Sequence, residues 1–122
     1  TFENITEDSL YVLIDKEQFI RALTNLMKNA EQSIPENRIG KIIIQAKKRS
    51  NTIEIKISDN GSGIPIENYQ QIFTPKFTTK NSGTGLGLAM VRNSINAFNG
   101  SIDFKSELGV GTTFTIKLPS AD

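Results

Sequence analysis

The feature that most restricts the fold of this chain is a pair of glycine clusters, each placed at the boundary of a regular element. The first lies at residues 58–65, Ser-Asp-Asn-Gly-Ser-Gly-Ile-Pro, where an alternating strand pattern ends at Asp59. The second cluster, with Gly83, Gly85 and Gly87, opens a predicted helix. Glycines at a helix N-terminus let an anion approach the free backbone N–H groups closely. This layout is typical of a nucleotide pocket.

Simpler explanations of the two clusters fail on spacing and context. Asn60-Gly61 is a strong hairpin signal, but no second alternating strand follows it at once. A calcium loop needs an acidic or amide side chain where Gly61 stands. The second cluster has Leu88 where a dinucleotide fold needs its third glycine, and it lacks the Gly-Lys-Ser/Thr ending of a Walker loop.

Length and composition restrict the class of protein. The chain has 122 residues, 37% of them hydrophobic, which favours one domain with a single core. The net charge is +1 with scattered Lys and Arg, so we expect no nucleic-acid partner. There is no cysteine and no histidine, which excludes a thiolate metal site and a histidine base or phosphoacceptor within this chain. No apolar run approaches the ~20 residues of a membrane span, so we expect a soluble piece without membrane contact. The absence of cysteine fits a reducing compartment, which favours a cytoplasmic location.

Periodicity predicts the regular elements, although residues 1–9 carry no clear pattern. The predicted strands are at residues 10–14, 41–46, 52–58, 101–106 and 113–118, and the predicted helices at 16–34, 66–73 and 85–98. Asp15 is the predicted N-cap of the first helix. Asn25 and Asn29 lie four residues apart beside that helix's apolar stripe, so their amides project together. Its stripe is formed by Phe19, Leu23, Leu26, Met27, Ala30 and Ile34.

Residues 74–84 have no apolar period. They are rich in turn formers and carry Lys76 and Lys80, which predicts a mobile surface loop that acts as a lid. Phe73 and Phe77, four residues apart, could anchor the base of this loop or pack in a minor core, and the residues alone favour packing.

Five motifs in register resemble a known family. They are NLMKNA at residues 25–30, DNGSGIP at 59–65, IFTPKFTTK at 72–80, GTGLGLAMV at 83–91 and GVGTTFTIKLP at 109–119. In order and spacing they resemble the N, G1, F, G2 and G3 boxes of the ATP-binding catalytic domain of sensor histidine kinases, members of the GHKL superfamily. The resemblance implies the Bergerat fold, an α+β two-layer sandwich. Its sheet would be mixed but mainly antiparallel, with about five strands and about three helices on one face.

The resemblance also implies roles at matching positions. Asp59 would accept a hydrogen bond from the adenine amino group, with Thr112 beside it, and Asn29 would ligate Mg²⁺. Asn25 would line the same phosphate region, and Lys80 would contact phosphate from the lid, so Asn25, Asn29 and Lys80 form the implied catalytic set. The remaining nucleotide-binding positions are Gly61, Gly63, Ile64, Phe73, Phe77, Gly83, Thr84, Gly85, Leu86, Gly87 and Leu88.

The implied activity is transfer of the γ-phosphoryl group of Mg-ATP to a histidine on a separate dimerisation domain of the same protein, and then to the receiver domain of a response regulator. Residues 1–122 would be one catalytic domain of a longer chain, monomeric by itself. One alternative is an ATPase or serine kinase of the same fold, but such relatives carry a Glu base four residues before the Mg²⁺-binding Asn, where this chain has Asn25. The other alternative is a pseudokinase module that binds nucleotide without transferring phosphate.

Overall fold

The chain forms a five-stranded sheet with the strand order β1-β2-β3-β5-β4. The computed structural model describes residues 2–6, 16–73 and 87–120. The strands are β1 (Phe2–Thr6), β2 (Ile42–Arg49), β3 (Thr52–Asp59), β4 (Ser101–Glu107) and β5 (Gly111–Pro119). β1 pairs with β2 in parallel, and all other neighbours are antiparallel. The expectation of a mixed, mainly antiparallel sheet is therefore confirmed.

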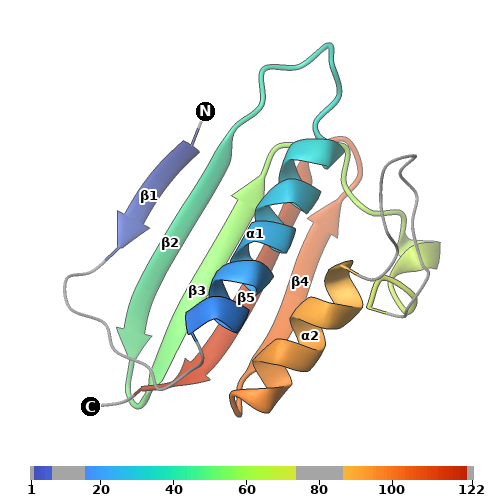
Figure 1. Cartoon of the computed structure of the whole chain (residues 1–122). Coiled ribbons are helices and arrows are strands. Elements are labelled where there is room, and N and C mark those ends of the chain that lie inside the picture. Colours follow the sequence, from blue (N-terminus) through green and yellow to red (C-terminus); the bar gives the residue numbers. More distant parts are fainter. Residues whose placement is uncertain (1, 7–15, 74–86, 121–122) are drawn as a thin grey trace.

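Two α-helices lie on one face of this sheet (Figure 1). They are α1 (Lys16–Ser33), which contacts β3, and α2 (Gly87–Ala97), which contacts β4 and packs beside α1. The predicted two-layer α+β architecture is confirmed. Among the described residues, two α-helices and one 3-10 turn, η1 (Ile66–Asn68), stand where about three helices were expected.

The core lies between the sheet and the helices because the apolar residues follow the period of each element. In β3 every second residue faces the helices, which buries Ile53, Ile55 and Ile57, while Glu54 and Lys56 face the other side. The predicted stripe of α1 places Leu26 in the same core at 0% exposure. The remaining fully buried large side chains are Val91, Ile95, Phe114, Ile116 and Leu118.

The predicted helix at residues 66–73 is wrong, and one strand was not predicted. Residues 66–73 form a single 3-10 turn followed by further turns, because Asn68 and Tyr69 donate their backbone N–H groups to carbonyls three residues earlier. Ile66 at the start of this segment is 76% exposed, whereas Ile72 near its end is 2% exposed in the core. Residues 2–6, in which we saw no pattern, form the edge strand β1.

Several other predictions fall outside the described residues. These are the strand at residues 10–14, the N-cap Asp15, the lid at 74–84 and the start of the last helix at Gly85.

Candidate nucleotide-binding site

A pocket opens where β3 ends, and its walls come from segments far apart in the sequence. The end of α1, the residues after β3, the start of α2 and the start of β5 all contribute. Its lining combines apolar with polar side chains, and small-molecule sites commonly use polar groups to orient the ligand. The lining residues are Asn29, Gln32, Ser33, Asp59, Ser62, Gly63, Ile64, Pro65, Asn68, Ile72, Leu88 and Thr112.

Asp59 is the last residue of β3, and the structure fixes the orientation of its carboxylate. Its Oδ1 atom accepts a hydrogen bond from the backbone N–H of Gly61 at 2.8 Å. In the sheet register Asp59 pairs with Thr112 of β5. An ionised carboxylate is a pure acceptor, so this corner of the pocket favours a ligand that donates.

Thr112 and Ser106 lie beside Asp59 on the two neighbouring strands, so the three polar residues form a row across β3, β5 and β4. Thr112 is only 5% exposed and pairs with Ser106 of β4, and the two hydroxyl oxygens lie 2.8 Å apart. Ser106 Oγ also accepts the backbone N–H of Ile64 at 2.7 Å, while its carbonyl accepts the Tyr69 hydroxyl at 2.7 Å. We did not predict Ser106. The alternation of Ile102 and Phe104 could have identified it, because it places the next alternate residue on the same face.

Two glycines let the segment after β3 pack closely. Gly61 is buried, and a Cβ atom there would lie 2.2 Å from Ser33 Oγ at the end of α1. Gly63 has φ +80°, and a Cβ atom there would lie 2.4 Å from the backbone oxygen of Glu107. Larger residues at these two positions would push the segment away from α1 and from the β4–β5 turn.

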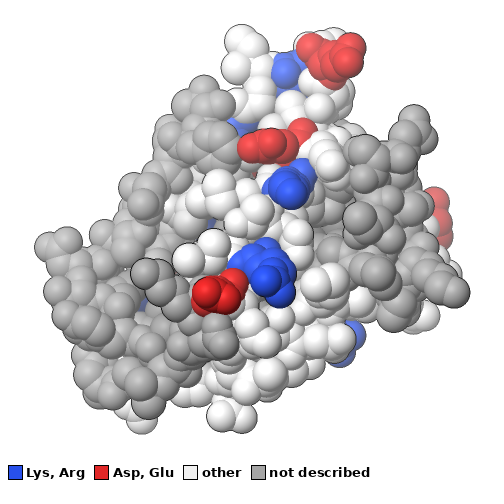
Figure 2. Space-filling view, in the orientation of Figure 1, with Lys and Arg blue, Asp and Glu red and all other residues white. Residues whose placement is uncertain are grey.

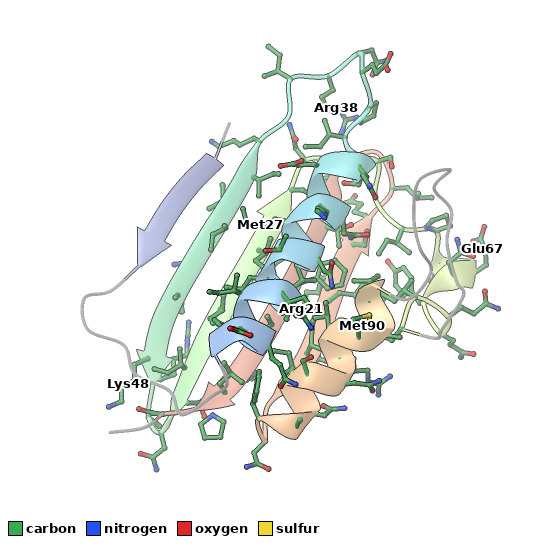
Figure 3. The ribbon with its side chains drawn as sticks, viewed as in Figure 1. Arg21, Met27, Arg38, Lys48, Glu67 and Met90 are labelled. Carbon is green, nitrogen blue, oxygen red and sulfur yellow. The ribbon has the colours of Figure 1, made fainter. Side chains whose placement is uncertain are left out.

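Arg38 connects three segments around the pocket, and sequence reasoning missed it. It lies on the loop between α1 and β2, beyond the C-terminal end of α1 (Figure 3). Its guanidinium donates to the backbone oxygens of Asn60 and Gly61, the latter at 2.9 Å, and to that of Gly109 at 3.2 Å. An isolated arginine in a turn gives no local signal of such long-range bonds.

Asn25 and Asn29, the two asparagines of α1, border different depressions of the surface. Asn29 is half-buried and lines the pocket with Asp59, as do Gln32 and Ser33 one turn later. Asn25 instead borders a separate, open depression on the outer side of α1, beside Arg21 and other polar residues. The structure thus brings Asn29, but not Asn25, to the Asp59 pocket, and the phosphate-side role of Asn25 stays a prediction.

The other implied site residues divide into three groups. Gly63, Ile64 and Leu88 line the pocket, and Gly87 is the first residue of α2. Phe73 does not line the pocket: its ring packs edge-on against Phe104 and Phe114, with the Arg92 guanidinium 5.4 Å from its centre. Outside the described residues lie Phe77, Lys80, Gly83, Thr84, Gly85 and Leu86.

The electrostatic surface of the helix-bearing face is mixed. Figure 2 shows Lys and Arg side chains interspersed with Asp and Glu among the described residues of this face, without a large patch of one sign. Within residues 2–6, 16–73 and 87–120, no group of three or more Asp, Glu, His or Cys side chains could hold a metal ion. None of the helices in that part of the chain combines the length and hydropathy needed to cross a membrane.

Comparison with known proteins identifies the family of this chain. Residues 14–122 match the family described as histidine kinase-, DNA gyrase B-, and HSP90-like ATPase. Sporulation kinase B of Bacillus subtilis is 40% identical over 98% of this chain, which spans 28% of that protein. The signal transduction histidine-protein kinase AtoS of Escherichia coli is 46% identical over 86% of this chain, which spans 17% of that protein. The chain therefore corresponds to less than a third of either relative.

Solved structures agree with these relatives. The catalytic domain of histidine kinase ThkA is 33% identical with a TM-score of 0.85, over 97% of this chain and 77% of that domain. Full-length ShkA, solved in complex with AMPPNP, is 25% identical with a TM-score of 0.83, over 98% of this chain and 26% of that one. This chain belongs to the histidine kinase-, DNA gyrase B- and HSP90-like ATPase family, and its relatives within the family are sensor histidine kinases.

Proposed function

We propose that this chain binds Mg-ATP in the Asp59 pocket and transfers the γ-phosphoryl group to a histidine on a separate dimerisation domain, as the catalytic domain of a two-component sensor histidine kinase. The observation that carries the proposal is the pair of neighbouring polar side chains Asp59 and Thr112, which line one pocket together with apolar side chains. Asp59 would accept a hydrogen bond from the adenine amino group. Ile64, Ile72 and Leu88 supply apolar surface for the flat faces of the base.

The described residues fit a magnesium ion that is carried in by the nucleotide. Mg²⁺ takes oxygen ligands and usually keeps substrate phosphates and waters as most of them, so one protein amide is sufficient. Asn29 lines the pocket and would hold the ion through its amide oxygen. When bound, the ion would neutralise negative charge on the phosphates.

The phosphoacceptor must come from elsewhere, because this chain contains no histidine. No strong base is needed on this domain, since a neutral imidazole is already nucleophilic and positioning supplies much of the catalysis. The histidine would belong to a dimerisation domain of a longer protein, which would pass the phosphoryl group to a response regulator. The domain by itself would be monomeric and cytoplasmic, and sedimentation of the isolated chain checks the first point.

Calorimetric titration with a non-hydrolysable ATP analogue, with and without Mg²⁺, tests the nucleotide site. Asp59→Asn keeps an oxygen for the Gly61 N–H but replaces an acceptor with a donor. We expect about ten- to a hundredfold weaker binding, the usual cost of losing a hydrogen bond to a charged group. Asp103→Asn, at an exposed position of β4, makes the same chemical change outside the pocket and should leave affinity unchanged. Equal affinities for both variants would contradict the proposed adenine contact.

A transfer assay then separates the possible activities. With labelled ATP, the chain alone should gain no acid-labile phosphoryl group, and a histidine-bearing dimerisation domain added in trans should gain one. Repeated ATP hydrolysis without any partner would instead support the ATPase alternative. Tight ATP binding without transfer to a competent partner would support the pseudokinase alternative.

A further inference from the structure

The hydroxyl of Ser106 has three hydrogen-bonding neighbours and a single proton to share among them. The backbone N–H of Ile64 can only donate to it, at 2.7 Å. The backbone oxygen of Gly111 can only accept from it, at 3.1 Å. The third neighbour is the Thr112 hydroxyl, at 2.8 Å, which can do either.

Counting protons and lone pairs assigns the direction of the third bond. Ser106 Oγ has one proton and two lone pairs. In the one arrangement that makes all three contacts hydrogen bonds, the proton goes to Gly111 and one lone pair takes the Ile64 N–H. The remaining lone pair can therefore only accept, so Thr112 donates its proton to Ser106. With that proton engaged, the Thr112 oxygen offers only lone pairs to the pocket that it lines.

The floor of the pocket therefore offers two adjacent acceptors, the Asp59 carboxylate and the Thr112 oxygen, which belong to paired residues of β3 and β5. An exocyclic amine carries two N–H donors and matches this arrangement. A ring carbonyl in the same place would face two acceptors and receive a hydrogen bond from neither, and an unmade hydrogen bond is costly in a buried site.

We infer that Ser106 is a specificity-determining residue that acts through Thr112: it holds the Thr112 proton and so makes the pocket select 6-amino purines over 6-oxo purines. Ser106 itself lines no part of the pocket and is thus a positioning residue. The inference rests on the proposed function, because it takes the Asp59 pocket to be the base-binding site.

The test compares a non-hydrolysable ATP analogue with its inosine counterpart, which carries a carbonyl in place of the 6-amine and a proton on N1. The unchanged chain should bind the adenine form at least about tenfold more tightly. In Ser106→Ala the Thr112 hydroxyl can turn and donate to a carbonyl, so the ratio of the two affinities should fall about five- to tenfold. A loss of pocket shape alone would weaken both ligands equally and leave this ratio unchanged.

Matched variants isolate the path through Thr112. Ser106→Thr keeps the hydroxyl and should keep the ratio, and Ser101→Ala, an exposed position on the same strand, should do the same. In a Thr112→Val background, which has no hydroxyl to orient, Ser106→Ala should no longer change the ratio. An unchanged affinity ratio in the double variant would show that Ser106 acts by orienting the Thr112 hydroxyl.

The outcomes are distinguishable from those of the proposed function. If the unchanged chain binds the adenine analogue but Ser106→Ala keeps the full adenine preference, the inference is overturned and the ATP site stands. If Ser106→Ala lowers the ratio equally with Thr112→Val present, the path through Thr112 is wrong. If the unchanged chain binds neither analogue, the proposed function fails, and the inference fails with it.

Discussion

At the scale of single residues, the pocket depends on positions where the chain runs unusually close to itself. Gly63 and Gly109 both have φ +80°, the left-handed region that side chains rarely adopt. They differ in their surroundings. A Cβ atom on Gly63 would meet the backbone of Glu107 and Leu108, whereas a Cβ atom on Gly109 would have nothing within 4 Å.

This pair predicts two different costs for the same substitution. Gly109→Ala should lower the free energy of unfolding by about 1–2 kcal/mol, the cost of a left-handed backbone for an L-residue. Gly63→Ala should lower it by a further 1–3 kcal/mol or so, because backbone atoms must also move apart, and it should weaken nucleotide binding. Urea unfolding of both variants provides the measurement, and equal losses would show that the contact with Glu107 is unimportant.

Single residues also show which parts of the site a sequence can predict. Asp59 was identifiable because it ends an alternating strand directly before two glycines, and the register then places Thr112 beside it. Arg38 and Ser106 act on backbone groups that are distant in the sequence. The alternation in β4 could have placed Ser106 on the inner face, but its bonds, like those of Arg38, depend on which turns meet in three dimensions.

At the scale of elements, α1 has two tasks that lie on different parts of the same helix. Its inner face packs on the sheet through fully buried residues such as Leu26, and its C-terminal end brings Asn29 to the pocket. On the outer side, Ile20 is 51% exposed.

Truncation of the helix side chains should reflect this division. Leu26→Ala should lower the free energy of unfolding by about 2–5 kcal/mol, because it removes buried methyl groups and leaves a cavity. Ile20→Ala should lower it by less than about 1 kcal/mol, since alanine is a good helix former and the site is half in water. Thermal unfolding followed by circular dichroism compares the two, and similar losses would argue against the burial of Leu26.

Elements with a strong period were predictable, and those without one were not. The apolar repeats of α1 and β3 each agree with burial on one face, so local pattern and tertiary packing coincide. In contrast, the turns of residues 66–73 follow tertiary contacts, including the Tyr69 hydroxyl bond to Ser106 and the edge-on packing of Phe73 against Phe104. β1 is joined to one neighbour only, and its short, mixed sequence gives no alternation on its own.

At the scale of the whole molecule, the pocket is lined by residues of both α-helices and of the neighbouring strands β3 and β5. A ligand held by all of them binds the folded chain and not the unfolded one. Nucleotide binding is therefore linked to global unfolding.

This linkage predicts how far nucleotide raises stability. At a free ATP-analogue concentration of 100 times Kd, the free energy of unfolding should rise by about 2.7 kcal/mol, and the midpoint should depend on ligand concentration. Calorimetric unfolding at several concentrations measures the effect. Asp59→Asn at the same concentrations should show a smaller rise, and an unchanged midpoint for the native chain would exclude specific binding to the folded state.

The strand order determines when, during synthesis, the pocket can form. β5 is the last described strand along the chain, yet it lies between β3 and β4 (Figure 1). During synthesis β5 emerges from the ribosome after β3 and β4. Until then one edge of β3 is unpaired, and an unpaired strand edge can pair with other chains. Asp59 gains Thr112 only at that moment. A nascent chain released before residue 111 would thus be exposed to aggregation and unable to hold nucleotide, whatever the state of its helices.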